Sequence, residues 1–174
     1  MRGGEGLGRA VEYAAFRRGN EVALPFYHNA EITVPFGRKE VLCIQETTSY
    51  PFDNRVDIRV ISAPKRDVTL SLAHASWMEG FKVTLNGKTP LETSVAEGMA
   101  SITMKLKAGD RIQVAFDMKP RIESTLNSEN NESGSFKVFC GPLLLAAQDA
   151  CPEGFARTSA FESLGGNLFL VEGT

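Results

Sequence analysis

Hydrophobic and polar positions alternate along most of the chain from residue 20 onward, which is the period of a half-buried β-strand. The clearest case is Arg55–Ile61, where Val56, Ile58 and Val60 would form one face and charged residues the other. Similar segments recur at intervals of about 8–12 residues, as in β-sandwiches. We expect about ten strands, at residues 22–27, 31–34, 41–46, 55–61, 68–73, 82–85, 101–106, 111–116, 136–139 and 143–147, with a further short one at 167–171.

Turn signals separate these segments and leave no room for helices between them. Asn86-Gly87 is typical of a type I′ turn, whose two central residues need a positive φ. Ala108–Asp110 separates two alternating segments by a length that suits a β-hairpin. A parallel α/β fold would need a helix between successive strands. The pattern therefore predicts an all-β fold, an antiparallel, jelly-roll-like β-sandwich.

The segment Leu7–Arg18 has a different pattern and is rich in alanine and arginine. Its larger apolar residues follow the spacing of one helix face, namely Leu7, Val11, Ala14 and Ala15. Gly19-Asn20 is typical of the residues that end a helix. We expect one short N-terminal helix, whose apolar stripe would promote self-association of the chain.

Composition and charge exclude several classes of protein. The 174 residues include 19 Lys and Arg against 21 Asp and Glu, and 43% of them are hydrophobic. The near-neutral balance argues against nucleic-acid binding. Because no stretch approaches the roughly 18 apolar residues of a membrane span, we expect no membrane partner. The first eight residues are not an apolar signal segment, and the compartment stays open.

Three cysteines, Cys43, Cys140 and Cys151, are widely spaced. An odd number at this spacing predicts neither a disulfide framework nor a zinc site. We interpret them as reduced thiols, which favours a reducing compartment.

The search for catalytic chemistry yields only weak candidates. His28 and His74 each lack a second histidine nearby in the sequence, so a packing role is the simpler interpretation. Asp53 and Asp57 could share a strand face, as paired carboxylates of glycosidases must. Their neighbouring arginines instead favour a solvated face with ion pairs. The glycine-rich turn at residues 3–8 resembles an anion-binding turn, but no strand precedes it.

Aromatic residues offer one further possibility. Tyr50-Pro51-Phe52 and Trp77 could form a platform on which a sugar ring stacks. Such platforms usually contain two or three exposed rings, and the chain has a single Trp. We therefore favour the interpretation that Trp77 fills the gap between two sheets where a strand ends.

Four motifs, taken in order, resemble one protein family. Glu46–Val60 is similar to its stretch Q-E-T-x-Y-P-W-x-G-x-V-x-L-x-V, and Leu72–Gly87 to R-I-P-x-W-x-x-G-x-x-V-x-V-N-G. Leu106–Val114 is similar to W-x-x-G-D-x-V-x-L, and Phe139–Gln148 to R-G-P-L-V-Y-A-x-E. The family is the domain of unknown function 1680 group, which includes glycoside hydrolase family 127, the β-L-arabinofuranosidases. The chain departs from these motifs at His74, Ala75, Lys107 and Cys140.

The resemblance implies that this chain corresponds to the C-terminal β-sandwich region of much longer proteins. In that family an (α/α)6 barrel precedes the sandwich and carries a cysteine nucleophile, a zinc ion and a glutamate acid/base. Those residues lie upstream of everything matched here. The resemblance therefore transfers no catalytic, cofactor-binding or metal-binding residue to this chain, and no cofactor is expected.

The expected organisation has three regions. Residues 1–19 would be a remnant helix of an upstream helical domain, residues 20–150 the β-sandwich, and residues 151–174 an irregular tail with a last strand. The sandwich is either one, or two small ones divided near residue 75.

Three functions remain open. The favoured one is a non-catalytic accessory module of a glycoside-hydrolase-like protein, whose partner is a helical-barrel catalytic domain or a second copy. The first alternative is a stand-alone carbohydrate-binding module, which would expose Trp77 and Tyr50. The third is a glycosidase whose site is shared between chains, built from His28 with Asp53 or Asp57.

Overall fold

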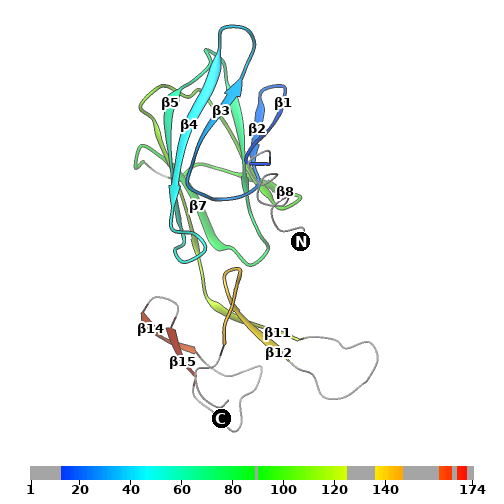
Figure 1. Cartoon of the computed structure of the whole chain (residues 1–174), viewed down its shortest axis with the longest axis vertical. Helices are drawn as coiled ribbons and strands as arrows, with labels where there is room; N and C mark the ends of the chain where they lie inside the picture. Colours follow the sequence, from blue (N-terminus) through cyan, green and yellow to red (C-terminus); the bar gives the residue numbers. More distant parts are fainter. Residues whose placement is uncertain (1–12, 89, 125–135, 147–160, 166–167, 172–174) are drawn as a thin grey trace, which may run out of the picture. The chain divides into compact units, whose positions relative to one another are not determined.

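The computed structural model describes residues 13–88, 90–124, 136–146, 161–165 and 168–171. Within those ranges the chain contains strands and connections and no helix (Figure 1). The strands are β1 (Phe16–Arg18), β2 (Glu21–Leu24), β3 (Ala30–Pro35), β4 (Val41–Thr48), β5 (Arg55–Ser62), β6 (Val68–Ala73), β7 (Glu79–Leu85), β8 (Ser94–Ala96), β9 (Met99–Met104), β10 (Arg111–Asp117), β11 (Pro120–Ser124), β12 (Phe136–Cys140), β13 (Leu143–Leu144), β14 (Phe161–Gly165) and β15 (Leu168–Val171). The all-β class predicted from the alternating pattern is confirmed.

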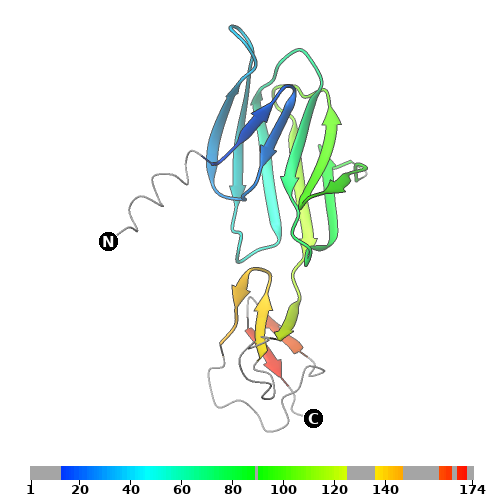
Figure 2. The same ribbon diagram turned by 90° about the vertical axis from the view of Figure 1, so that its right-hand side faces the viewer.

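The chain forms two compact units, Met1–Asp117 and Met118–Thr174. The first contains two five-stranded sheets, sheet A in the order β1-β2-β6-β9-β8 and sheet B in the order β3-β4-β5-β10-β7. In Figure 1, β4 and β5 of sheet B lie to the left of β1, β2 and β8 of sheet A, so the sandwich is seen as two layers. Figure 2 looks onto sheet A. Each of these two sheets contains strands that precede residue 75 in the sequence and strands that follow it.

The core of this unit lies between the inward faces of the two sheets. On β5 the burial pattern alternates strictly, with Val56, Ile58 and Val60 buried and the intervening residues exposed. Each such side chain contributes on the order of 1.5–3 kcal/mol when it leaves water. The other buried members are Val22, Leu24, Val68, Leu70, Leu72, Ala100 and Ile102 of sheet A and Ile32, Val34, Leu42, Ile44, Val83, Ile112, Val114 and Phe116 of sheet B.

The expected N-terminal helix is not observed. Phe16–Arg18, the last residues of the predicted helix, form β1, which pairs antiparallel with β2 through Phe16↔Ala23 and Arg18↔Glu21. Gly19, with φ of 62°, is part of the tight turn between the two strands rather than a helix end. Hairpin pairing therefore overrides the helical spacing in this segment. Residues 7–12 lie outside the described part of the chain.

Two connections also differ from expectation. The turn at Ala108–Asp110 does not close a hairpin, because β9 belongs to sheet A and β10 to sheet B. The loop instead carries the chain from one layer to the other, and Gly109 N donates to Val60 O at 2.8 Å. Within sheet A, β2 pairs with β6 in parallel, whereas every other pair is antiparallel among the described strands. The jelly-roll connectivity stays a prediction.

The Asn86-Gly87 turn is confirmed. Both residues have positive φ, 54° and 68°, and Lys88 N donates to Leu85 O at 3.1 Å. A second turn of this kind, Glu97-Gly98, joins β8 to β9 with φ of 51° and 75°. The sequence analysis missed that hairpin, since β8 has only three residues, all of them exposed.

The second unit contains a three-stranded sheet, β11-β12-β13, and the two-stranded sheet β14-β15. Its buried thiol, Cys140, lies 3.9 Å from Met118 O. Arg121 places its guanidinium carbon 4.9 Å from the centroid of the Phe139 ring and donates to Gly141 O. The expected domain bounds of 1–19, 20–150 and 151–174 do not map one to one onto the two units and stay a prediction. Within the described residues no helix is long and apolar enough to cross a membrane.

Candidate functional site

Aromatic side chains gather at one end of the sandwich, where β2, β4 and β10 finish and β7 begins. Phe116, the inward residue near the end of β10, lies at the centre of this cluster. Its ring centroid is 5.9 Å from that of Trp77, 6.1 Å from Tyr50 and 6.3 Å from both Tyr27 and Phe81. Trp77 and Tyr50 approach edge-on, whereas Tyr27 and Phe81 stack. We call these five residues the aromatic cluster.

A buried carboxyl group lies beside this cluster. Glu46 occupies an inward-facing position of β4 and is 1% exposed. Its Oε1 accepts a hydrogen bond from the backbone N–H of His28 at 2.6 Å, and its Oε2 has no hydrogen-bond partner among the described residues. Burial raises the pKa of Glu46 to about 7, although the His28 N–H acts in the opposite direction. The carboxyl group is therefore partly neutral near physiological pH.

Tyr27 connects the carboxyl group to the other sheet. Its hydroxyl donates to the backbone carbonyl of Ala73, at the end of β6, at 2.6 Å. Burial, and then the negative charge of Glu46, raise the pKa of Tyr27 well above its usual range. Tyr27 thus stays a hydrogen-bond donor throughout the physiological pH range, and it ties the β2–β3 connection to β6.

This arrangement suits packing better than acid–base chemistry. A carboxyl group with a raised pKa is a common feature of active sites. A general acid, however, must reach a substrate oxygen at hydrogen-bond distance. Glu46 is closed off from solvent, and the oxygen that has a partner bonds the backbone of its own chain. The sequence signal was present, since Glu46 continues the inward series of Leu42 and Ile44 along β4, but Glu46 was predicted there only as part of a motif.

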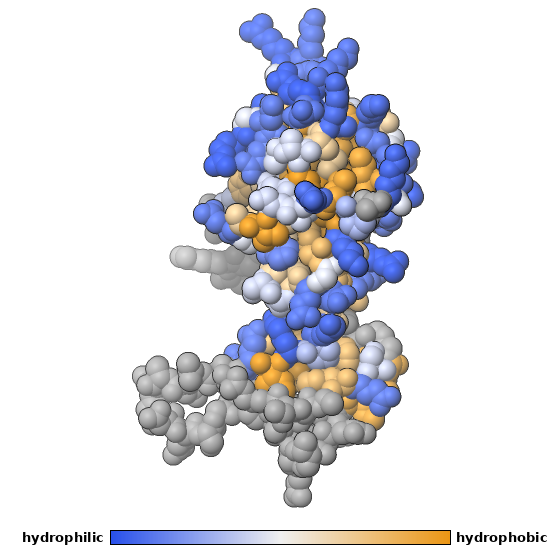
Figure 3. Space-filling view, turned by 180° about the vertical axis from the view of Figure 1, so that it is seen from behind, coloured by the Kyte–Doolittle hydropathy of each residue, from blue (hydrophilic) through white to orange (hydrophobic). Residues whose placement is uncertain are grey.

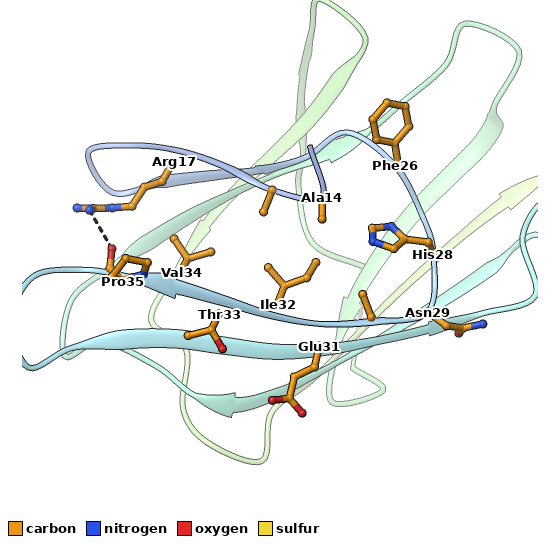
Figure 4. Close-up of a pocket in the computed structure, with 12 residues that line it drawn as sticks. Ala14, Arg17, Phe26, His28, Asn29, Glu31, Ile32, Thr33, Val34 and Pro35 are labelled. Atoms are coloured by element: carbon orange, nitrogen blue, oxygen red, sulfur yellow. Dashed lines mark hydrogen bonds between the residues drawn. The ribbon is translucent and has the colours of Figure 1, made fainter. Parts of the chain in front are cut away.

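The second feature of the site is a groove of about 740 Å³ along β3 (Figure 4). Ile32 and Val34 project from β3 towards Ala14, whereas Glu31 and Thr33 point away. At one end Arg17 Nη1 donates to Pro35 O at 2.9 Å, and its guanidinium carbon lies 4.5 Å from the centroid of the Phe36 ring. At the other end stand Phe26, which is 59% exposed, and the half-buried His28. The side chain of His28 therefore stands at the groove, while its backbone N–H bonds Glu46.

Of the other candidate residues, His74 borders the aromatic cluster, whereas Asp53 and Asp57 have different hydrogen-bond partners. The His74 ring lies edge-on to Phe81, with centroids 4.8 Å apart. Asp53 accepts from the N–H of its neighbour Asn54 at 2.7 Å, and Asp57 accepts from Gln113 Nε2 at 2.9 Å. In the described ranges no three His, Cys, Asp or Glu side chains form a group that could hold a metal ion.

Two of the three cysteines are described, and both are free thiols. Cys43 is half-buried on β4, where Thr33 Oγ1 lies 3.6 Å from its sulfur. Burial raises the pKa of the Cys140 thiol in the second unit, although the nearby Arg121 charge opposes this. Cys151 and the glycine-rich residues 3–8 fall outside the described ranges.

Fold and site together define a β-sandwich module in which side chains from the quoted motifs pack against Phe116 or lie buried beside it. Glu46 and Tyr50 come from the first family motif quoted above, and Trp77 comes from the second. A family model, the middle domain of the GH127 β-L-arabinofuranosidases, matches residues 21–118. The chain belongs to this family. The C-terminal placement and the link to the domain of unknown function 1680 stay predictions.

Solved structures agree with this assignment at the level of fold. The chain is similar to a GH127 β-L-arabinofuranosidase from Geobacillus stearothermophilus T6 with a TM-score of 0.68 and 22% identity, covering 80% of this chain and 22% of that one. A structure described as a glycoside hydrolase has a TM-score of 0.71 and 20% identity, and the match covers 80% of this chain and 23% of that one. A GH127 β-arabinofuranosidase has a TM-score of 0.66 and 23% identity, and the match covers 76% of this chain and 23% of that one. The chain thus spans less than a quarter of these relatives. No curated protein matches.

Proposed function

We propose that this chain is a non-catalytic β-sandwich module of a GH127-type glycoside hydrolase, which supports a separate catalytic domain. One observation carries the proposal: three residues of the motifs that resemble the family are used for packing. Glu46 is closed off from solvent and bonds backbone, while Tyr50 and Trp77 set their rings against Phe116. Side chains used in this way stabilise the end of the sandwich.

The carbohydrate-binding alternative has weaker support. It requires several exposed rings on one surface. Tyr50 and Trp77, the two rings that this alternative would expose, are half-buried in the aromatic cluster. The strongly exposed rings are Phe26 and Phe52, at 59% and 69%.

Exposed apolar side chains support an interaction with another domain or a second copy. Figure 3 shows hydrophobic surface in the middle of the larger unit, bordered by hydrophilic side chains. A soluble monomer rarely leaves large contiguous apolar patches uncovered. The exposed large apolar residues of this unit are Tyr13, Phe16, Phe26, Val41, Phe52, Ile61 and Val95. The proposal therefore includes a partner, either a helical-barrel catalytic domain or the same chain.

The experiment that tests the proposal combines two measurements on the purified chain. Metal content is measured by mass spectrometry, and hydrolysis is measured on a panel of nitrophenyl glycosides that includes the β-L-arabinofuranoside. We expect no stoichiometric metal and no turnover. Stoichiometric zinc together with turnover would overturn the proposal. Glycan binding without turnover would instead support the carbohydrate-binding alternative.

A further inference from the structure

The groove lies on an open side of the sandwich, between the edge strands of the two sheets. Among the described strands, β3 is the first of sheet B and pairs only with β4, while β1 is the first of sheet A and pairs only with β2. The groove is lined by β3 along one wall and by Ala14, Ala15 and Arg17 on the other. An edge strand at a hollow is a template for a further strand.

The direction of the β3 peptide groups follows from two hydrogen bonds. Phe36 N donates to Glu40 O at 2.8 Å in the β3–β4 hairpin, so the peptide groups of Phe36 face β4. Because these groups alternate in direction along an antiparallel strand, those of Ile32 and Val34 also face β4. The peptide groups of Glu31, Thr33 and Pro35 then face the groove. The bond from Arg17 to Pro35 O, which comes from the β1 side, agrees with this direction.

Two residues therefore present unused backbone groups to the groove. Arg17 already occupies the carbonyl of Pro35, and proline has no N–H. For Glu31 and Thr33, no backbone hydrogen bond outside the β3–β4 ladder is found among the described residues. Two N–H groups and two carbonyls thus stand in a row beside an apolar hollow, the arrangement that accepts an added strand.

We propose that β3 accepts an extended segment of the polypeptide that precedes the middle domain in GH127 proteins, which binds in the groove as an additional strand of sheet B. The inference rests on the proposed function, since it assumes that the module works beside a preceding domain. The chain covers only 22–23% of each solved relative, so most of the polypeptide lies outside the matched module. Ala14 and Ala15, which precede the matched residues 21–118 in the sequence, line the groove.

A second copy of the chain fits the groove less well. In a symmetric pair each β3 would have to enter the hollow of the other molecule. β3 itself lies along the wall of its own hollow, opposite Ala14 and Ala15. Two concave edges of this kind cannot enter one another, whereas a single extended segment can.

The groove also specifies the side chains of its occupant. Side chains alternate between the two faces of a strand. Those on the inner face would contact Ile32 and Val34, which are 7% exposed, together with Ala14 and Phe26, and must be apolar. Those on the outer face would lie beside the exposed Glu31 and Thr33, where basic or hydroxyl side chains fit best. The occupant is thus a short alternating segment with apolar and polar or basic residues.

The test uses overlapping 12-residue peptides that cover the sequence preceding the matched region in the Geobacillus stearothermophilus T6 enzyme. Each is titrated into the ¹⁵N-labelled chain, and amide hydrogen exchange is followed residue by residue. We expect one peptide to slow exchange at Glu31 and Thr33 at least tenfold. The same peptide, N-methylated at alternate amides, should bind at least tenfold more weakly.

A variant pair tests the protein side of the contact. Thr33→Pro removes the free N–H and should weaken binding at least tenfold, whereas Thr33→Val keeps it and should bind like wild type. The methylated peptide leaves the protein unchanged, so the test stands even where Thr33→Pro does not fold. Absence of protection by every peptide, undiminished binding of the methylated peptide, or dimerisation through β3 would each overturn the inference. None of these outcomes affects the metal and turnover assay, so the two proposals fail separately.

Discussion

The backbone N–H of His28 donates to Glu46 Oε1 at 2.6 Å, which fastens the connection between β2 and β3 to the inward face of β4. The bond crosses from the segment that leaves sheet A to a central strand of sheet B. Its acceptor is a buried carboxyl group, so the charge of that group affects the stability of the sandwich. Glu46, a residue of the first quoted motif, therefore holds together the end of the sandwich where the aromatic cluster lies.

The first prediction concerns pH. The pKa of Glu46 is about 7 in the folded protein and near 4.5 in the unfolded chain, so the folded state holds the proton more tightly. The stability contributed by the protonated group is fully present below about pH 4.5 and is lost as pH rises to about 7. The loss is on the order of 3 kcal/mol, since each pKa unit corresponds to about 1.4 kcal/mol. Glu46→Gln should remove this dependence, because its amide keeps the acceptor oxygen and carries no charge.

Urea unfolding of wild type and Glu46→Gln at pH 5, 6, 7 and 8 measures the effect. The difference between the two free energies of unfolding isolates Glu46 from other carboxyl groups. We expect the variant to gain stability relative to wild type as pH rises. A constant difference across this range would show that Glu46 titrates normally.

The second prediction concerns the aromatic cluster. Phe116→Ala removes the ring that contacts Tyr27, Tyr50 and Trp77, and should lower the free energy of unfolding by about 3–5 kcal/mol. Phe52→Ala is the matched control, since Phe52 lies at the same end and is 69% exposed. It should change stability by less than about 0.5 kcal/mol. Similar losses in the two variants, measured by chemical denaturation, would rule out Phe116 as the centre of the cluster.

A third prediction compares two glycines with positive φ. A Cβ at Gly80 would lie 3.2 Å from Asp117 Oδ2, whereas one at Gly87 would meet open space. Gly87→Ala should therefore cost only the left-handed backbone penalty, about 1 kcal/mol. Gly80→Ala should cost about 1 kcal/mol more, since the contact with Asp117 must also be relieved. Thermal and urea unfolding of the two variants give the comparison, and an equal cost would count against the close approach of β7 and β10 at this point.

Much of the sandwich can be predicted from the sequence because its core is built from strict alternation. Val56, Ile58 and Val60 share the face of β5 that points into the core, and alternate apolar residues in the sequence therefore identify the buried face. The Asn86-Gly87 turn is equally local, since both residues must adopt positive φ. Features of this kind depend on a few neighbouring residues and are visible in the sequence.

The features that could not be predicted depend on partners distant in the sequence. Residues 7–18 have helical spacing, yet Phe16–Arg18 form a strand because β2 offers backbone partners across a two-residue turn. Ala108–Asp110 has the length of a hairpin loop, yet β9 before it belongs to sheet A and β10 after it belongs to sheet B. The aromatic cluster likewise unites residues from three connections and two strands, and its spatial arrangement follows only from the folded sheets.

The proposed function requires that Glu46, Tyr50 and Trp77 pack the sandwich rather than perform catalysis. The most direct measurement is the release of nitrophenol from nitrophenyl β-L-arabinofuranoside by wild type and Glu46→Gln, side by side at pH 5 to 8. We expect that neither protein exceeds the buffer blank, while the folded state of both is verified by circular dichroism. Release by wild type that is lost in a folded Glu46→Gln variant would contradict the claim, because Glu46 would then be a catalytic acid.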